Sequence, residues 1–399
     1  MVRISTNLFF QRSTNAMLEQ QSNLSHTQLQ MATGERILMP SEDPSASSRI
    51  LGLNGAIDTL SQYLDNANFV SSRLAQEEDA ISSATNLLQR ANQLAVQGNH
   101  DIYSTSDKGA IAAEIRELLS AMISLGNSRD VNGEYIFSGY QANTRAFSQT
   151  AAGVFEYHGD QGQRALQVSA ERTVADGDNG LSVFMDVDTG PYGEVLGIAA
   201  ATFNEIPDGD LTINGIGLGR IPAAADAAER ADQLRDAINV ISDVTHVYAE
   251  FDTTDTLRLF SSAGDITIAG IAPTADTGLT AGVTAASTGK RSVFSTLDEL
   301  ATALESGSVS VDRYINDVQE ALTHMSEIRG SIGARMRTAE DQMEINGDVR
   351  LTLESQRSDE RDLDYAEAIA RFNQQTLALQ AAQQAYVKVQ NLSLFNFLR

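Results

Sequence analysis

Proline and glycine are distributed very unevenly along this chain of 399 residues, and no other feature limits its fold as strongly. Four of the six Pro and 17 of the 29 Gly lie between residues 151 and 290. No Pro follows residue 291, and neither Pro nor Gly occurs between Asp348 and Arg399. Because both residue types interrupt helices, the pattern predicts an α+β multidomain protein with long helices at both ends and a β-rich insertion between them.

Apolar residues in the helical parts repeat with the alternating four- and three-residue spacing that is typical of coiled coils. The first such row contains Leu53, Ile57, Leu60, Leu64, Ala67, Leu74, Ile81 and Leu88. A second helix carries Ile111, Ile115, Leu118, Met122 and Leu125, with an N-cap at or near Ser106, and a third carries Val318, Leu322, Met325, Ile332, Met336, Ala339 and Met343. We expect these helices to bundle within one chain, with the carboxylates of Glu77, Glu78 and Asp79 on a solvated face.

The two ends of the chain carry weaker apolar rows. Phe10, Met17, Leu24 and Met31 recur every seven residues, and Tyr365, Ile369, Phe372, Thr376, Leu379 and Tyr386 keep the four-three spacing. Gln and other polar residues separate them, so neither row predicts a helix that is stable alone. A continuous helix over 348–399 would be roughly 78 Å long at about 1.5 Å per residue, too long for this chain to cover by itself. These ends are either solvated helical tails or, the interpretation we favour, segments that order against neighbouring subunits.

The middle of the chain is predicted to contain strands. Val154–Tyr157 and Leu166–Val168 flank Gly159-Asp160 in a hairpin pattern, and residues 209–215 predict a short strand and turn. Residues 223–241 have a helical period, and strands are expected over 244–251, 256–260 and 265–269.

Composition excludes several classes of function. The formal net charge is −25 and the 151–290 segment alone carries 21 acidic and 7 basic residues, which argues against a nucleic-acid binder or a polybasic membrane-surface protein. The chain has no Cys, and hence no disulfide, thiolate metal site or cysteine nucleophile. No run of apolar residues is long enough for a membrane helix, and residues 1–40 lack the features of a cleaved secretory signal.

Motifs for catalysis or for metal and cofactor binding are weak. Gly215, Gly217 and Gly219 follow a turn and lack the spacing of a dinucleotide fingerprint. The runs that begin at Asp176 and Asp186 resemble the start of a calcium loop but have Val187 and Gly197 where the twelfth-position Glu belongs, so turn chemistry is the better interpretation. The five His are scattered. We therefore predict no catalytic residues, no metal, no cofactor and no enzymatic activity.

Three segments resemble the flagellin superfamily. The opening Val2-Arg-Ile-Ser-Thr-Asn7 is similar to the start of that superfamily, and Ala385-Tyr-Val-Lys-Val-Gln-Asn-Leu-Ser-Leu-Phe395 is similar to its C-terminal helix. The loop Thr33-Gly-Glu-Arg-Ile-Leu-Met-Pro-Ser-Glu-Asp-Pro44 resembles the turn after its first helix. Pro40–Pro44, Tyr135–Gly139 and Ser393–Leu398 resemble a member that joins hook to filament more than flagellin itself. Residues 210–268 resemble a small module that is inserted in such proteins.

The resemblance implies three nested domains. Residues 1–42 with 363–399 would form a terminal assembly domain that is disordered in the monomer, 43–150 with 290–362 a helical-bundle middle domain, and 151–289 a β-rich outer domain containing the module at about 208–270. The loop between the first two would turn at Gly34, Arg36, Pro40, Asp43 and Pro44, since Gly34 permits a positive φ and the prolines would stop the helix. The predicted assembly interface contains Phe10, Met17, Leu24, Met31, Ile369, Phe372, Leu379, Tyr386, Leu394 and Phe395. Each of its apolar side chains would contribute about 1.5–3 kcal/mol if fully buried.

The resemblance also implies partners and a location. Such a subunit would lie outside the cell at the hook–filament junction, exported unfolded by the flagellar type III apparatus with a chaperone and without a cleaved signal peptide. It would contact flagellin, the hook-side junction protein (hook-associated protein 1) and copies of itself in a ring, with no nucleic acid and no membrane insertion. Three alternatives stay open: flagellin proper, a secreted enzyme with its active domain in the insert, and an unrelated coiled-coil adhesin.

Overall fold

The computed structural model describes residues 6–100, 102–251, 256–261, 264–272, 274–306 and 311–397. Along the sequence, helices precede and follow a strand-rich middle, so the predicted α+β class is confirmed. The helices are α1 (Thr6–Thr33), α2 (Pro44–Gly98), α3 (Thr105–Gly126), the π-helical turn η1 (Leu181–Met185), α4 (Ala227–Val240), α5 (Ser242–Thr245), α6 (Thr274–Thr277), α7 (Val293–Ser306), α8 (Val311–Arg361) and α9 (Tyr365–Phe397).

The strands are short and lie between α3 and α7. They are β1 (Phe147–Gln149), β2 (Phe155–Tyr157), β3 (Ala165–Gln167), β4 (Thr173–Ala175), β5 (Val187–Asp188), β6 (Gly193–Leu196), β7 (Leu211–Ile213), β8 (Ile216–Gly217), β9 (Val247–Phe251), β10 (Leu257–Ser261), β11 (Ile266–Gly270), β12 (Gly282–Thr284) and β13 (Lys290–Arg291).

The chain folds into two compact units, and each is described by itself. The terminal unit contains the residues up to Asp65 and those from Gln342 onward, and the central unit contains residues 66–341. Both α2 and α8 therefore contribute to each unit. The three-domain division expected from the sequence stays a prediction.

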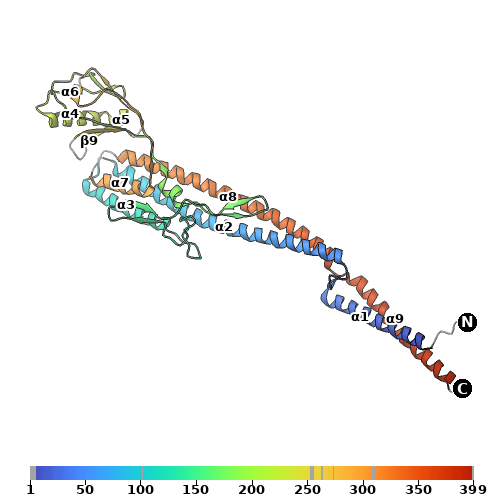
Figure 1. Ribbon diagram of the computed structural model, residues 1–399. Helices are drawn as coiled ribbons and strands as arrows, with labels where there is room; N and C mark the ends of the chain where they lie inside the picture. The colour runs from blue at the N-terminus through green and yellow to red at the C-terminus, as the bar shows by residue number, and fades with distance from the viewer. Residues whose placement is uncertain are drawn as a thin grey trace. The chain divides into compact units, whose positions relative to one another are not determined.

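In the terminal unit α1 and α9 lie side by side (Figure 1). The predicted continuous helix over 348–399 is wrong, because α8 ends at Arg361 and α9 begins at Tyr365. The break itself contains neither Pro nor Gly and depends on one hydrogen bond to the distant turn after α1 and one within the break. The N–H of Leu363 donates to the carbonyl oxygen of Gly34 (2.9 Å), and Oδ1 of Asp364 accepts from the N–H of Ala366 (2.9 Å), as an N-cap does.

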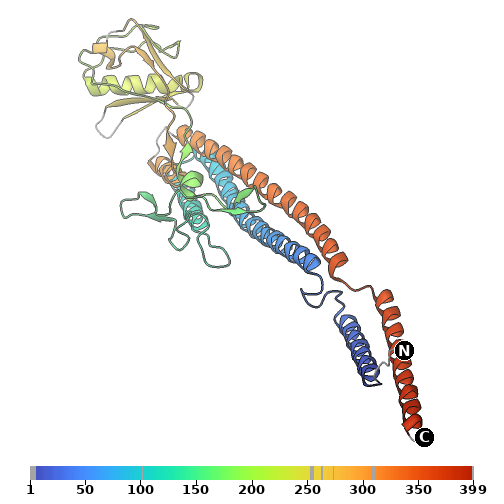
Figure 2. The ribbon, with the colours of Figure 1, turned by 45° about the vertical axis from the view of Figure 1, so that its right-hand side comes forward.

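In the central unit α2 and α8 run side by side in both views (Figures 1 and 2). The predicted apolar rows face inward: Leu74, Ile81 and Leu88 of α2 are buried, as are Met325 and Ile332 of α8. An ion pair of 2.7 Å between Glu78 and Arg329 links the two helices beside this core.

The helices α3 and α7 pack together against a cluster of aromatic side chains. Ser104 caps α3 in a reciprocal capping box with Asp107, two residues before the expected Ser106. The ring of Phe147 lies 4.9–5.6 Å from the rings of Tyr157, Phe184 and Phe294. This cluster fixes the start of the inserted segment on the helical bundle.

The strand pairing after α3 differs from the prediction. β2 pairs with β1, and β3 pairs with β4, so the expected hairpin across Gly159-Asp160 does not form. Oδ1 of Asp160 instead accepts hydrogen bonds from the N–H groups of Tyr140 and Gly162. The bond from Tyr140 holds the turn at Asp160 against the loop before β1.

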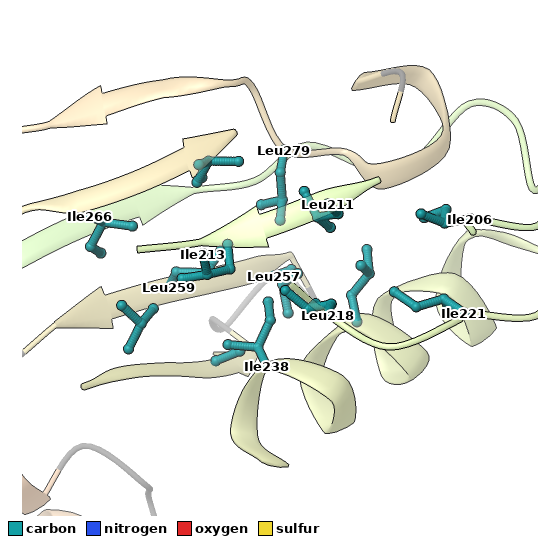
Figure 3. Close-up of a cluster of buried hydrophobic side chains, with 14 residues drawn as sticks. Ile206, Leu211, Ile213, Leu218, Ile221, Ile238, Leu257, Leu259, Ile266 and Leu279 are labelled. Carbon is teal, nitrogen blue, oxygen red and sulfur yellow. The ribbon is translucent and has the colours of Figure 1, made fainter. Parts of the chain in front are cut away.

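The outer part of the insertion has its own core, shown in Figure 3. A three-stranded sheet (β6-β10-β9) and a four-stranded sheet (β12-β11-β7-β8) pack with α4 around 14 buried residues, among them Ile213, Leu234, Ile238 and Leu259. The expected helix over 223–241 starts four residues late because Asp226 caps it, and Val244 lies in α5 where a strand was expected. The strand and Asn214-Gly215 turn after residue 209 form as predicted.

Candidate assembly surface

The turn that joins α1 to α2 starts at Gly34, which has a φ of +76°. This left-handed conformation ends α1, and a side chain there would be strained. Glu35 pairs with Asp362 in an isolated β-bridge, and the N–H of Arg36 donates to the carbonyl oxygen of Arg361 (2.8 Å). The turn after α1 and the break before α9 are therefore one hydrogen-bonded structure.

The prolines of this loop do not stop a helix, contrary to the prediction. Pro44 is the first residue of α2, where its missing N–H costs nothing, and Oδ1 of Asp43 caps the helix by accepting from the N–H of Ala46 (2.9 Å). Pro40 lies in a turn closed by a hydrogen bond from the N–H of Glu42 to the carbonyl oxygen of Met39 (3.0 Å).

Charged side chains hold the loop in place. Nη2 and Nε of Arg49 donate to the carboxylate of Glu360, each at 3.0 Å, and the hydrogen bond from Arg49 lowers the pKa of Glu360. Nε2 of His26 lies 2.9 Å from Oε1 of Glu42, and this contact lowers the pKa of Glu42. All four side chains are partly exposed, so each pair contributes modestly to stability.

The predicted interface residues on α1 and α9 are only partly covered. Met17, Leu24, Met31, Phe372, Leu379 and Tyr386 are half-buried, and Ile369 is 46% exposed. Phe10, Leu394 and Phe395 belong to the helices, but their side chains lie outside the described residues. The assembly role of all ten residues stays a prediction.

Sequence reasoning missed a second set of apolar side chains, which the terminal unit leaves open to solvent. It consists of Leu8, Leu18, Leu29, Met39, Leu51, Ile345, Val349, Leu351, Leu377 and Val387. Tyr365, which belongs to the predicted C-terminal row, is exposed as well. Leu18 and Leu29 are 11 residues apart, about three helical turns, and therefore lie on one face of α1. That spacing was a signal in the sequence, but these residues fall outside the seven-residue row that starts at Phe10.

Two polar side chains of α1 are buried where the sequence suggested solvent. Thr27 and Gln30 are both buried, and Nε2 of Gln30 donates to the carbonyl oxygen of Arg36 (2.6 Å). Gln30 thus holds the turn from within α1, whereas Oγ1 of Thr27 donates to the carbonyl oxygen of Asn23 in the same helix (3.1 Å).

A further expectation fails on α2 in the central unit. Glu77 was assigned to a solvated face and is instead fully buried, while Glu78 is half-buried in its ion pair. Asp176 and Asp178, noted for their likeness to a calcium loop, form ion pairs with Arg164 and Arg335, as turn chemistry would allow.

The described residues contain no cluster of three or more metal-ligating side chains. Within the same ranges, no helix has the length and apolarity to cross a bilayer.

Two family models match the ends of the chain. The bacterial flagellin N-terminal helical region matches residues 4–142, and the bacterial flagellin C-terminal helical region matches residues 315–398, together more than half of the chain. The chain belongs to the flagellin family, which is structural and non-enzymatic, and so it is a protein of the bacterial flagellum.

Within this family the chain is similar over its whole length to flagellar hook-associated protein 3 of Escherichia coli, with 25% identity over 395 residues and 99% of each chain covered. It is 30% identical over 186 residues to flagellar hook-associated protein 3 of Salmonella typhimurium, a match that covers 47% of this chain and 58% of the relative. The flagellin of Clostridium tyrobutyricum is 26% identical over 136 residues, which cover 34% of this chain and 36% of the relative.

The fold is also similar to a solved structure, that of flagellar hook associated protein-3 from Legionella pneumophila. The TM-score is 0.54 at 20% sequence identity, and the match covers 77% of this chain and 97% of the other. At this identity the likeness concerns the fold.

Proposed function

We propose that this protein is the adaptor that joins the hook-side junction protein to the first layer of flagellin. The observation that carries the proposal is the extent of similarity: hook-associated protein 3 of E. coli aligns with 99% of this chain, whereas a flagellin aligns with 34%. Flagellin proper is therefore the less favoured alternative.

An adaptor acts by binding alone, and the terminal unit offers surface for it. The half-buried row on α1 and α9 and the exposed apolar set, which includes Leu18, Leu29 and Leu377, give this unit more than one apolar face. Exposed apolar side chains that recur along a helix mark protein interfaces. These faces would contact copies of the same chain in a ring, with hook-associated protein 1 on one side and flagellin on the other.

The same proposal includes the route to that position. The chain would be exported unfolded by the flagellar type III apparatus, with an export chaperone and without a cleaved signal peptide, and would act outside the cell. The absence of Cys agrees with a chain that needs no disulfide after export.

A clean deletion tests the proposal. Electron microscopy of the deletion strain should show hooks without filaments, and the medium should contain unpolymerised flagellin. Expression of the intact chain from a plasmid should restore the filaments. Normal filaments on the deletion strain would overturn the adaptor function.

A further inference from the structure

The central unit contains a buried group of charged side chains that its apolar core does not explain. Arg73 of α2 is buried and forms ion pairs with Asp130 (3.1 Å), Glu134 (3.4 Å) and Asp176 (3.5 Å). Arg164 also contacts Asp176, at 2.6 Å, and Arg335 of α8 pairs with Asp178. Three stretches of chain that are far apart in sequence thereby meet around one turn of α2.

Glu77 lies in the middle of this group and has no cation of its own. Its exposed fraction is 0%, and its Oε1 accepts a hydrogen bond of 3.0 Å from the backbone N–H of Asp178. Its Oε2 is buried without a hydrogen-bond partner. A Cβ built on Gly177 would lie 3.7 Å from that oxygen, so the loop 176–180 covers this face of Glu77.

The guanidinium groups near Glu77 are already paired with other carboxylates. From α2, the 163–180 segment and α8 come the guanidinium groups of Arg73, Arg164 and Arg335, and against them stand the carboxylates of Asp130, Glu134, Asp176 and Asp178. Glu78, the neighbour on α2, is paired with Arg329. An ionised Glu77 would add a fifth carboxylate to a group that holds three guanidinium groups, at a position where its side chain is fully buried.

We propose that Glu77 holds the loop 176–180 between α2 and α8 only while its carboxyl group is protonated, and that loss of this proton releases the loop. A neutral carboxyl can stay buried in this position and still accept the hydrogen bond from Asp178. Once ionised, it is repelled by the carboxylate of Asp178 and loses its hydration, and together these two effects outweigh the attraction of Arg335 and Arg73. Outward movement of the loop would relieve both. Burial, with the nearby Asp178 charge, raises the pKa of Glu77 to about 8, in the direction that this geometry requires.

The expected dependence on pH follows from linkage. The pKa of Glu77 is higher in the folded protein than its ordinary value of 4.5, so the stabilisation from its bound proton is complete below pH 4.5. It is lost as the pH rises toward 8. Glu77→Gln keeps the shape of the neutral acid and removes the titration.

The experiment measures urea unfolding of the full chain between pH 5 and pH 8.5 for the wild type, Glu77→Gln and the control Glu78→Gln. The ratio of the wild-type folding equilibrium constant to that of Glu77→Gln should fall tenfold or more as the pH rises over this range. The folding equilibrium constant of Glu78→Gln should change with pH as that of the wild type does. At pH 8.5, amide exchange in 176–180 should be faster in the wild type than in Glu77→Gln, and at pH 6 the two should agree.

A second measurement does not depend on the stability of the variant. The infrared C=O stretch of a protonated carboxylic acid should be present in the wild type at pH 7 and disappear near pH 8. Because burial also raises the pKa of Asp317, Asp317→Asn serves to separate the two groups. Parallel stability curves for wild type and Glu77→Gln, or no acid band at pH 7 in Asp317→Asn, would overturn the proposal.

Discussion

Nη2 of Arg36 donates a hydrogen bond of 2.7 Å to the backbone carbonyl oxygen of Glu360, a residue 324 positions further along the chain. In the opposite direction, the N–H of Leu363 donates a hydrogen bond to the carbonyl oxygen of Gly34 (2.9 Å). The turn after α1 and the break before α9 therefore form together, and they bring the two ends of the chain into one helical pair. An interface built from both α1 and α9 depends on this connection.

The first prediction concerns Gly34. Gly34→Ala should destabilise the terminal unit by about 1–2 kcal/mol, because φ is +76° there and the new Cβ would lie 3.2 Å from Oη of Tyr365. The control is Gly330→Ala in α8, where the added Cβ meets nothing within 4 Å and should stabilise the helix by about 0.5–1 kcal/mol. Urea denaturation followed by circular dichroism measures both. Equal stability of Gly34→Ala and wild type would contradict the role of this turn.

The second prediction concerns pH and Glu360. The hydrogen bond from Arg49 lowers the pKa of Glu360 in the folded protein, so its contribution to stability is present above the ordinary pKa of 4.5. The contribution is lost as the pH falls through the lowered value. Urea midpoints should therefore favour the wild type over Glu360→Gln at pH 6, and this advantage should vanish on acidification.

Glu354→Gln is the matched control for Glu360, because its partner Arg350 lies on the same helix. It should leave the connection between turn and break unchanged. If the urea midpoint of Glu360→Gln varied with pH in the same way as that of Glu354→Gln, the contact between Arg49 and Glu360 would have no role in connecting the turn to the break.

The third prediction concerns assembly. The double substitution Phe372→Asp and Leu379→Asp should prevent filament formation in the deletion strain. Both positions are half-buried, so the new Asp side chains would place charge in an apolar interface. The central unit of this double variant should still melt cooperatively. Gln374→Asp, an exposed position on the same helix, should restore filaments and serves as control. Filaments restored by the double variant would show that the assignment of this row is wrong.

The fourth prediction concerns the free monomer. We expect α1 and α9 to open more readily than the central unit in solution and so to be weakly protected from amide exchange. Their apolar rows are only half-buried by each other, and the remaining cover would come from other subunits. The central parts of α2 and α8 should exchange slowly in the same sample. Strong protection of residues 6–33 and 365–397 in the monomer would count against this expectation.

Periodicity in the sequence was sufficient to predict the helical core. The row from Ile57 to Leu88 is buried along most of its length, since a spacing of 3.5 residues requires only that one face meet a partner. The positive φ of Gly34 could be anticipated in the same way, because few other residues tolerate it.

Features that depend on distant partners could not be read from the sequence. The helix break at Asp362–Asp364 contains neither Pro nor Gly and depends on hydrogen bonds to residues 34–36. Glu77 sits beside two other carboxylates on α2, and its burial arises from a loop about 100 residues away. Asp160 accepts a hydrogen bond from the N–H of Tyr140 (3.0 Å), a partner 20 residues away that takes the place of the expected hairpin. Local patterns carry no information on such contacts.

The proposal that the chain is a junction adaptor is tested most directly by locating it in the flagellum. A peptide tag in the exposed turn at Gly209, where an added Cβ would meet no atom within 4 Å, would allow immunogold labelling of intact flagella. The adaptor function predicts gold in a single band between hook and filament. Gold distributed along the length of the filament would contradict it and would identify the chain as a filament subunit.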